Sequence, residues 1–215
     1  MSGLLVLGAG GHGRVVAYTA RCTGLWSTIA YLDDRFPGVQ VIDDCPLLGR
    51  LDAASTLVSR FADAVVALGD GRARMNLMRQ VRGQGFRLPV VIHPSAAVSE
   101  HAEIGAGTVV FAQCVVHPGA TLGEGCIVNT AVTIDHDCHI GAGVHLSPGV
   151  HIGGEVRVGD LSWLGVGASV KNGITIGARV MVGAGAAVVT NIPDSVTVVG
   201  VPAHPTDTRV NSAND

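Results

Sequence analysis

The stretch VNTAVTIDHDCHIGAGVHLSPGVHIGGEVRV, residues 128–158, has an aliphatic residue at every sixth position. The spacing continues in both directions, and it ends only where the next step falls on Asp194. This period is the signature of a parallel β-helix built from hexapeptide repeats. The positions that follow it are Ile92, Val98, Ile104, Val110, Val116, Leu122, Val128, Ile134, Ile140, Leu146, Ile152, Val158, Leu164, Val170, Ile176, Val182 and Val188.

A second, longer period lies on top of the first. An aliphatic residue followed by glycine recurs every eighteen residues, at 104–105, 122–123, 140–141, 158–159 and 176–177. Three hexapeptides therefore make one coil, and residues eighteen apart are stacked at one strand spacing, about 4.8 Å. The residue two places before each aliphatic position is usually small, which suits a tight corner of the coil.

Composition excludes several classes of protein. The chain of 215 residues has a net charge of −3, which gives no basic surface for nucleic acid. No apolar run approaches the roughly 20 residues of a membrane span. The five cysteines contain no CxxC pair and indicate a reducing compartment. We therefore expect a cytoplasmic protein that binds neither nucleic acid nor a membrane.

The first part of the chain follows another rule. Residues 1–88 alternate between apolar strands and helical segments, which predicts a small Rossmann-like α/β domain with a parallel sheet. We place the β-helix at residues 89–205 and a polar tail at 206–215.

A glycine-rich loop, GAGGHG at residues 8–13, follows the first strand and matches G-x-G-x-x-G. Asp33 lies twenty residues beyond Gly13, where a dinucleotide-binding fold has its ribose-binding acid. Taken alone, this pattern predicts NAD. A domain of about 90 residues is too short for the second mononucleotide half, and a glycine turn at a helix N-terminus suits any diphosphate. The nucleotide carried by a sugar therefore fits better.

Residues 135–145 concentrate ionisable groups in a chain that is only 14% charged. A metal site, a catalytic base and an ordinary surface are the three interpretations. Histidine suits a general base because its pKa lies near 6.5, and a neighbouring carboxylate can orient the ring and stabilise its charged form. His136, flanked by Asp135 and Asp137, supplies these groups.

With these motifs, the chain resembles the hexapeptide-repeat N-acetyltransferases that modify nucleotide-linked amino sugars, of the bacillosamine and perosamine type. The hexapeptides, GAGGHG, HDCHIG (136–141) and VGVPAHP (199–205) carry the resemblance. Sialic acid O-acetyltransferases belong to the same superfamily. The resemblance implies a left-handed β-helix, a homotrimer, and acetyl-CoA bound in the cleft between adjacent helices.

The resemblance also assigns roles to residues, and it implies no metal. His136 would be the general base and Asp137 its partner. The expected contacts of acetyl-CoA are His145, Gly154, Val166 and Ala184. Those of the nucleotide sugar are Gly10, Gly11, His12, Asp33, Asp34 and Gly69.

The end of the repeats departs from the family pattern. In GVPAHP, residues 200–205, His204 stands where hexapeptide acyltransferases usually have a basic residue beside CoA. Lys171, Arg179 or Arg209 would then meet the CoA phosphates. Pro193, Pro202 and Pro205 are expected to stop strand pairing.

The activity predicted is acetyl transfer from acetyl-CoA to the 4-amino group of a UDP- or GDP-linked sugar, directly and without an acyl-enzyme. O-acetylation of sialic acid or another sugar is an alternative, and a β-helix protein that binds a nucleotide sugar without chemistry is another. A zinc hydratase that resembles the β-helix carbonic anhydrases is a third alternative, and in that family two of the histidine ligands lie five residues apart on one chain. His136, His139, His145 and His151 are spaced by three and six.

Overall fold

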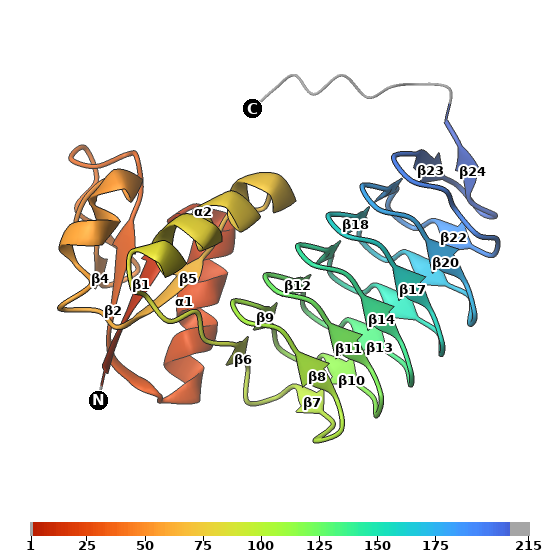
Figure 1. Cartoon of the computed structure of the whole chain (residues 1–215), viewed down its shortest axis with the longest axis horizontal. Helices are drawn as coiled ribbons and strands as arrows, with labels where there is room; N and C mark the ends of the chain where they lie inside the picture. The colour runs from red at the N-terminus through yellow and green to blue at the C-terminus, as the bar shows by residue number, and fades with distance from the viewer. Residues whose placement is uncertain (1, 207–215) are drawn as a thin grey trace.

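The computed structural model describes residues 2–206 and consists of a small α/β domain followed by a column of stacked coils (Figure 1). The predicted fold class, a small Rossmann-like domain followed by a parallel β-helix, is confirmed. The small domain packs against the first coils, and the chain then winds away from it toward the C-terminus (Figure 1).

The small domain is a three-stranded parallel sheet in the order β2-β1-β5, with a helix on each face. Alternate side chains of the central strand point to opposite faces, so that Leu4 and Val6 pack with α1 while Leu5 and Leu7 pack with α2. Its elements are β1 (Ser2–Leu7), α1 (Gly11–Thr23), β2 (Trp26–Leu32), β3 (Val41–Ile42), β4 (Cys45–Pro46), the 3-10 helix η1 (Leu51–Thr56), β5 (Asp63–Val66) and α2 (Gly71–Gly83).

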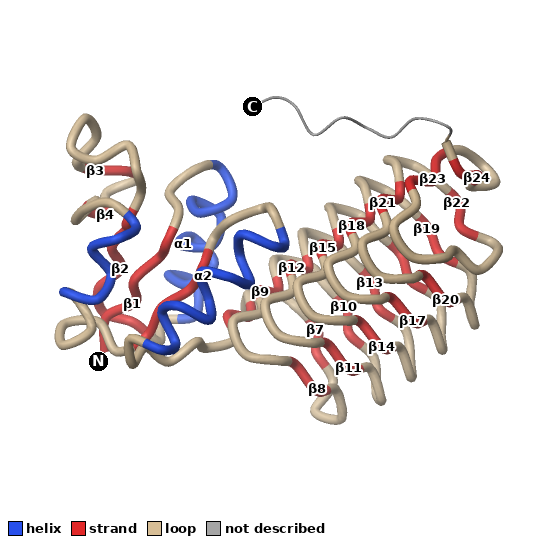
Figure 2. Tube along the Cα trace, turned by 45° about the horizontal axis from the view of Figure 1, so that its top comes forward, coloured by secondary structure: helices blue, strands red, loops and turns tan. Residues whose placement is uncertain are grey.

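The column contains three parallel sheets, and each coil contributes one two-residue strand to each sheet (Figure 2). All seventeen aliphatic positions of the repeat are the second residues of these strands, and their side chains fill the interior. The strands are β6 (Val91–Ile92), β7 (Ala97–Val98), β8 (Glu103–Ile104), β9 (Val109–Val110), β10 (Val115–Val116), β11 (Thr121–Leu122), β12 (Ile127–Val128), β13 (Thr133–Ile134), β14 (His139–Ile140), β15 (His145–Leu146), β16 (His151–Ile152), β17 (Arg157–Val158), β18 (Trp163–Leu164), β19 (Ser169–Val170), β20 (Thr175–Ile176), β21 (Met181–Val182) and β22 (Ala187–Val188).

Several of the small residues two places before the aliphatic positions also form hydrogen bonds with the backbone. The Thr108 hydroxyl donates to the carbonyl of Gly123 and accepts from the amide of Cys126. One coil further, the Cys126 thiol donates to Gly141, and Ser162 repeats the pattern of Thr108 between Gly177 and Val180. These side chains satisfy backbone groups that a corner leaves unpaired inside the column.

The column extends one strand beyond the break at Asp194. β23 (Thr197–Val199) pairs in parallel with β21, and β24 (His204–Pro205) folds back antiparallel to β23. The prediction that Pro205 stops strand pairing is therefore wrong. A proline lacks only the N–H, so at the sheet edge it can occupy a pairing position that needs no donor.

The small domain covers one side of the first coils. Val91, Val109 and Ile127 point outward from successive strands of one sheet, yet they are fully or almost fully buried, in one cluster with Val16 and Ala20 of α1. Helix α2 lies across the turns of the same coils. A Cβ on Gly125 would come within 2.8 Å of the sulfur atoms of Met75 and Met78, so any larger residue there would require these side chains to move.

No helix within residues 2–206 is long and apolar enough to cross a membrane.

Strand β20 offers a test of the inward and outward alternation, because Ile176 is 1% exposed while its neighbour Thr175 faces solvent. Ile176→Ala removes methyl groups from the column interior and should lower the free energy of unfolding by about 2–5 kcal/mol. Thr175→Ala should change it by no more than about 0.5 kcal/mol. Urea unfolding followed by circular dichroism measures both. Equal losses for the two variants would contradict the assigned interior.

Candidate active site

Three loops of the small domain meet at the carboxyl edge of its sheet, where open parallel sheets bind ligands. They follow β1, β2 and β5 and contain the predicted nucleotide-sugar contacts. The amide of Gly8 donates to Leu32 and the amide of Ala67 to Leu7, which joins the loops side by side. A Cβ on Gly13 would collide with the carbonyl of Gly8, so glycine there allows α1 to start directly against the loop. No atom would meet a Cβ on Gly10 or Gly11, which leaves the N-terminus of α1 open to a ligand.

The two acids after β2 have different surroundings. The Asp33 carboxylate accepts bonds from the amides of Ala9 and Arg35 and from the Arg35 guanidinium, at 2.7–3.3 Å. Burial would raise the pKa of Asp33, but these donors outweigh it and lower the pKa. Asp34 is exposed and has a looser contact of 3.4 Å with Arg50. Asp33 therefore shapes the glycine loop, and Asp34 is the acid that faces outward.

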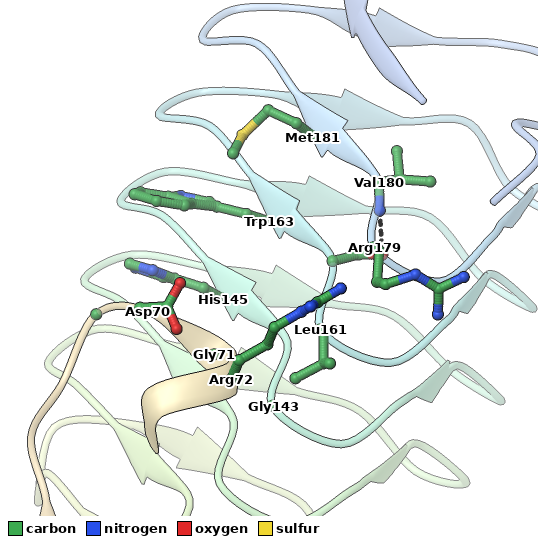
Figure 3. A pocket seen from close by; sticks show the side chains of 12 residues that line it. Asp70, Gly71, Arg72, Gly143, His145, Leu161, Trp163, Arg179, Val180 and Met181 are labelled. Atoms are coloured by element: carbon green, nitrogen blue, oxygen red, sulfur yellow. Dashed lines mark hydrogen bonds between the residues drawn. The ribbon is translucent and has the colours of Figure 1, made fainter. Parts of the chain in front are cut away.

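A pocket of about 170 Å³ lies between the small domain and the column (Figure 3). One wall is the end of the loop before α2 together with the first residues of that helix, residues 69–72, and the other is formed by stacked coils. On that wall His145, Trp163 and Met181 lie one above another on successive strands of one sheet (Figure 3). The His145 and Trp163 rings are nearly parallel, with centroids 4.9 Å apart, and the indole N–H donates to Ser147.

Two histidines at the junction of the domains are held neutral. Burial lowers the pKa of His145 to about 4, and the nearby Arg74 charge contributes. Burial also lowers the pKa of His12 to about 3, with further contributions from His145 and Arg74. Neither nitrogen of His145, nor Nε2 of His12, has a hydrogen-bond partner within residues 2–206. These nitrogens are buried polar atoms without a partner among the described residues, which is uncommon in folded proteins.

His136 has the opposite environment. It lies at the corner between β13 and β14, and its side chain is 54% exposed. Nδ1 is 2.9 Å from Oδ2 of Asp137, and this hydrogen bond, with the nearby Asp135 and Glu155 charges, raises the pKa of the ring. Because a carboxylate only accepts, Nδ1 carries the proton of the neutral ring, and Nε2 of that form has a lone pair that can accept a proton.

The neighbouring coils leave room for this pair. Asp137 has a left-handed backbone (φ 56°), which aspartate tolerates better than most residues. Gly119, one coil earlier, has no Cβ that would collide with the Asp137 carboxylate. Gly154, one coil later, lies under the imidazole, because a Cβ there would come 2.6 Å from Nε2 of His136.

The other predicted contacts of acetyl-CoA are spread over the column. His145 lies on a sheet, Gly154 on the same corner as His136, and Val166 and Ala184 are exposed on a different corner, between β18 and β19 and between β21 and β22. One chain therefore does not bring these residues onto one surface.

The cations considered for the CoA phosphates also differ in position. The Arg179 guanidinium lines the pocket and contacts Ser195 and Asp194, and Lys171 is exposed. Arg209 and the polar tail, apart from Thr206, lie outside the described residues.

Sequence reasoning missed two residues of the pocket region. Trp163 could have been found, because outward positions eighteen residues apart, from Val91 to Met181, are mostly apolar. Arg74 gave no such signal, since an arginine in the first turns of a helix usually faces solvent.

Within residues 2–206, no three histidine, cysteine, aspartate or glutamate side chains come together as metal ligands. The histidines of residues 136–151 point from different sheets and corners, which matches their spacing of three and six residues.

Comparisons with known proteins identify the family of the chain. Residues 3–81 match the family model described as PglD N-terminal domain. A curated relative, the UDP-N-acetylbacillosamine N-acetyltransferase of Bacillus subtilis (strain 168), is 36% identical over 114 residues. That alignment spans about half of each protein, 52% of this chain and 52% of the relative.

Solved structures match almost the whole chain. The acetyltransferase domain of PglB from Neisseria gonorrhoeae FA1090 is 44% identical, with a TM-score of 0.92 over 96% of this chain and 100% of that domain, and it was also solved in complex with acetyl coenzyme A. PerB from Caulobacter crescentus, in complex with CoA and GDP-perosamine, is 39% identical, with a TM-score of 0.91 over 96% of this chain and 98% of PerB. With this identity over nearly full length, the chain belongs to the hexapeptide-repeat family of nucleotide-sugar N-acetyltransferases.

Proposed function

We propose that the protein transfers the acetyl group of acetyl-CoA to the 4-amino group of a UDP- or GDP-linked sugar in the cytoplasm. The observation that carries this proposal is the His136–Asp137 pair, exposed at a corner above Gly154, with Nε2 free to accept a proton. Relatives similar over almost their whole length were solved with acetyl-CoA, or with CoA and GDP-perosamine, which supports the two substrates.

The nucleotide diphosphate would lie at the carboxyl edge of the small domain's sheet. The first amides of α1, at Gly11 and His12, offer donors and the positive end of a helix dipole to a phosphate. Gly10 lets the diphosphate approach the backbone, and Asp34 provides an outward acid for a ribose or a base. Asp33 would act indirectly by fixing the loop, and Gly69 would border the sugar.

In the transfer step, the amine nitrogen attacks the thioester carbonyl carbon. The C–N bond forms, the carbonyl electrons move to oxygen, and the C–S bond then breaks to release the CoA thiolate. His136 Nε2 accepts the proton that the nitrogen loses, and Asp137 stabilises the imidazolium that results. The amide of Gly154 would donate to the carbonyl oxygen, whose negative charge grows in the transition state.

The site would be shared between subunits. His136 lies at the corner between β13 and β14, whereas His145 lies on another side of the column, on β15, where it lines the pocket beside the small domain. A second copy that presents its corner to this pocket would bring the base to the substrate. We therefore propose a homotrimer, in which acetyl-CoA lies in the cleft between columns with its arm along Val166 and Ala184 and its acetyl end near His145.

A substrate panel tests the reaction itself. Purified protein with acetyl-CoA should release free thiol with UDP- or GDP-linked 4-amino sugars, and mass spectrometry should show the added acetyl group. Sialic acid and other hydroxyl acceptors should react at least tenfold more slowly. Faster reaction of a hydroxyl acceptor would assign O-acetylation, and binding of nucleotide sugars without thiol release would assign a non-enzymatic role.

Replacement of the proposed base should affect chemistry and not folding, because His136 is exposed. His136→Ala and His136→Asn should lower kcat by about 10²–10⁴-fold, the usual contribution of a general base. His139→Ala, at an exposed position three residues away, should remain within twofold of the unchanged protein. Retained turnover in the His136 variants, with unchanged oligomeric state by light scattering, would exclude His136 as the base.

The pH profile tests the pair. His136 accepts a proton only when it is neutral, so kcat/KM should fall with decreasing pH through a limb above the ordinary imidazole value of about 6.5. Asp137→Asn removes the largest cause of the raised pKa, so the limb should move to lower pH. The plateau rate should also fall at least about tenfold, since the ring loses its orientation. The ionisation of the substrate amine is the same in both proteins. A limb that stays in place or moves to higher pH would contradict the pairing.

A further inference from the structure

Arg74 is a buried cation with an unusual set of partners. Its side chain emerges from the first turns of α2, yet the residue is only 1% exposed. Four backbone carbonyls accept its hydrogen bonds, at 2.7–2.8 Å. Arg74 takes part in none of the ion pairs found within residues 2–206. The four acceptors are the carbonyls of Leu68, Gly69, Gly125 and Gly143.

These acceptors come from three separate parts of the chain. Leu68 and Gly69 belong to the loop before α2, whereas Gly125 and Gly143 are turn residues of successive coils of the column. Gly69 and Gly143 line opposite walls of the pocket that contains His145 and Trp163. The guanidinium therefore bonds to one residue of each wall, and its planar fork fixes the directions of these bonds in a way that a lysine could not.

We infer that Arg74 is a positioning residue that sets the distance between the two walls of this pocket and thereby the affinity for the substrates. The inference rests on the proposed function and names a residue through which the site is assembled. Arg74 lies outside the glycine-rich loop of residues 8–13 and the histidine-rich stretch of residues 135–145. Neither motif therefore predicts a role for Arg74.

The charge of Arg74 has a second effect on the same pocket. Burial lowers its pKa to about 10, so it is still protonated at neutral pH, and its charge helps to lower the pKa of His12 and His145. The other groups that face this region are Asp70 and Cys126, which raise the pKa of Arg74, and the exposed Arg72 and Arg179 at the pocket. Arg74 thus helps to keep both imidazoles neutral.

Two substitutions separate geometry from charge. Arg74→Lys retains the charge but cannot reach four carbonyls, and it should raise KM for nucleotide sugar and acetyl-CoA about tenfold. Arg74→Met should raise both about 100-fold. In each variant kcat should change by less than about threefold, because Arg74 does not contact the His136–Asp137 pair.

A matched control lies on the same helix. Arg82 also joins α2 to the column, through an exposed ion pair of 3.0 Å with Glu124, and such pairs contribute little. Arg82→Met should leave both KM values within twofold. Carbon-detected NMR titration of the imidazoles gives a readout independent of activity. His12 and His145 should titrate at higher pH in Arg74→Met than in the unchanged protein, and almost unchanged in Arg74→Lys.

The result that would overturn the inference is a lower melting temperature in both Arg74 variants with KM values and imidazole titrations like those of Arg82→Met. Arg74 would then be a structural residue only. If Arg74→Met does not fold, the KM values of Arg74→Lys decide. If the unchanged protein acetylates no nucleotide sugar, the proposed function fails, while the imidazole titrations still test the position of Arg74.

Discussion

The stacking of coils at one strand spacing is the constraint on which the rest of the structure depends. Each strand from β6 to β22 is only two residues long, and its second residue is an aliphatic side chain in the interior. The first residue must then point outward, because neighbours on a strand alternate. From β6 to β22, the face on which a residue lies follows from its number alone, modulo eighteen. His145, Trp163 and Met181 stack for this reason, and so do Gly119, Asp137 and the following turns.

This arithmetic explains why so much of the fold could be predicted from the sequence. Every aliphatic position from Ile92 to Val188 is found where the hexapeptide period predicts it. The sequence also marks the face of the column that the small domain covers, because the outward positions there hold the apolar, β-branched residues Val91, Val109 and Ile127. The end of the column was less predictable. The final turn is shorter, so Val198 enters the sheet sixteen residues after Val182 and out of the period.

The candidate site was predictable in its residue types but not in its partners. The position of His136 beside Asp137 follows from adjacency in sequence, and the roles of these residues remain predictions. The lowered pKa of Asp33 could not be predicted from the sequence. Its hydrogen-bond donors belong to Ala9 and Arg35, in two loops that come together only after folding. Arg74 is the extreme case. Its four acceptors are main-chain carbonyls, which every residue has, so the sequence carries no trace of them.

The glycine turns under α2 have a consequence for how such a chain can change in length. An insertion of eighteen residues between Gly143 and Val182 would add a whole coil, and every later side chain would keep its face but move about 4.8 Å farther from the small domain. An insertion of six residues between His145 and Trp163 would rotate all later residues to the next face, which would separate Trp163 and Met181 from His145. Only an insertion of whole coils therefore keeps every later residue on its face of the column. Even such an insertion preserves the packing of α2 only if it lies beyond the coils that this helix contacts.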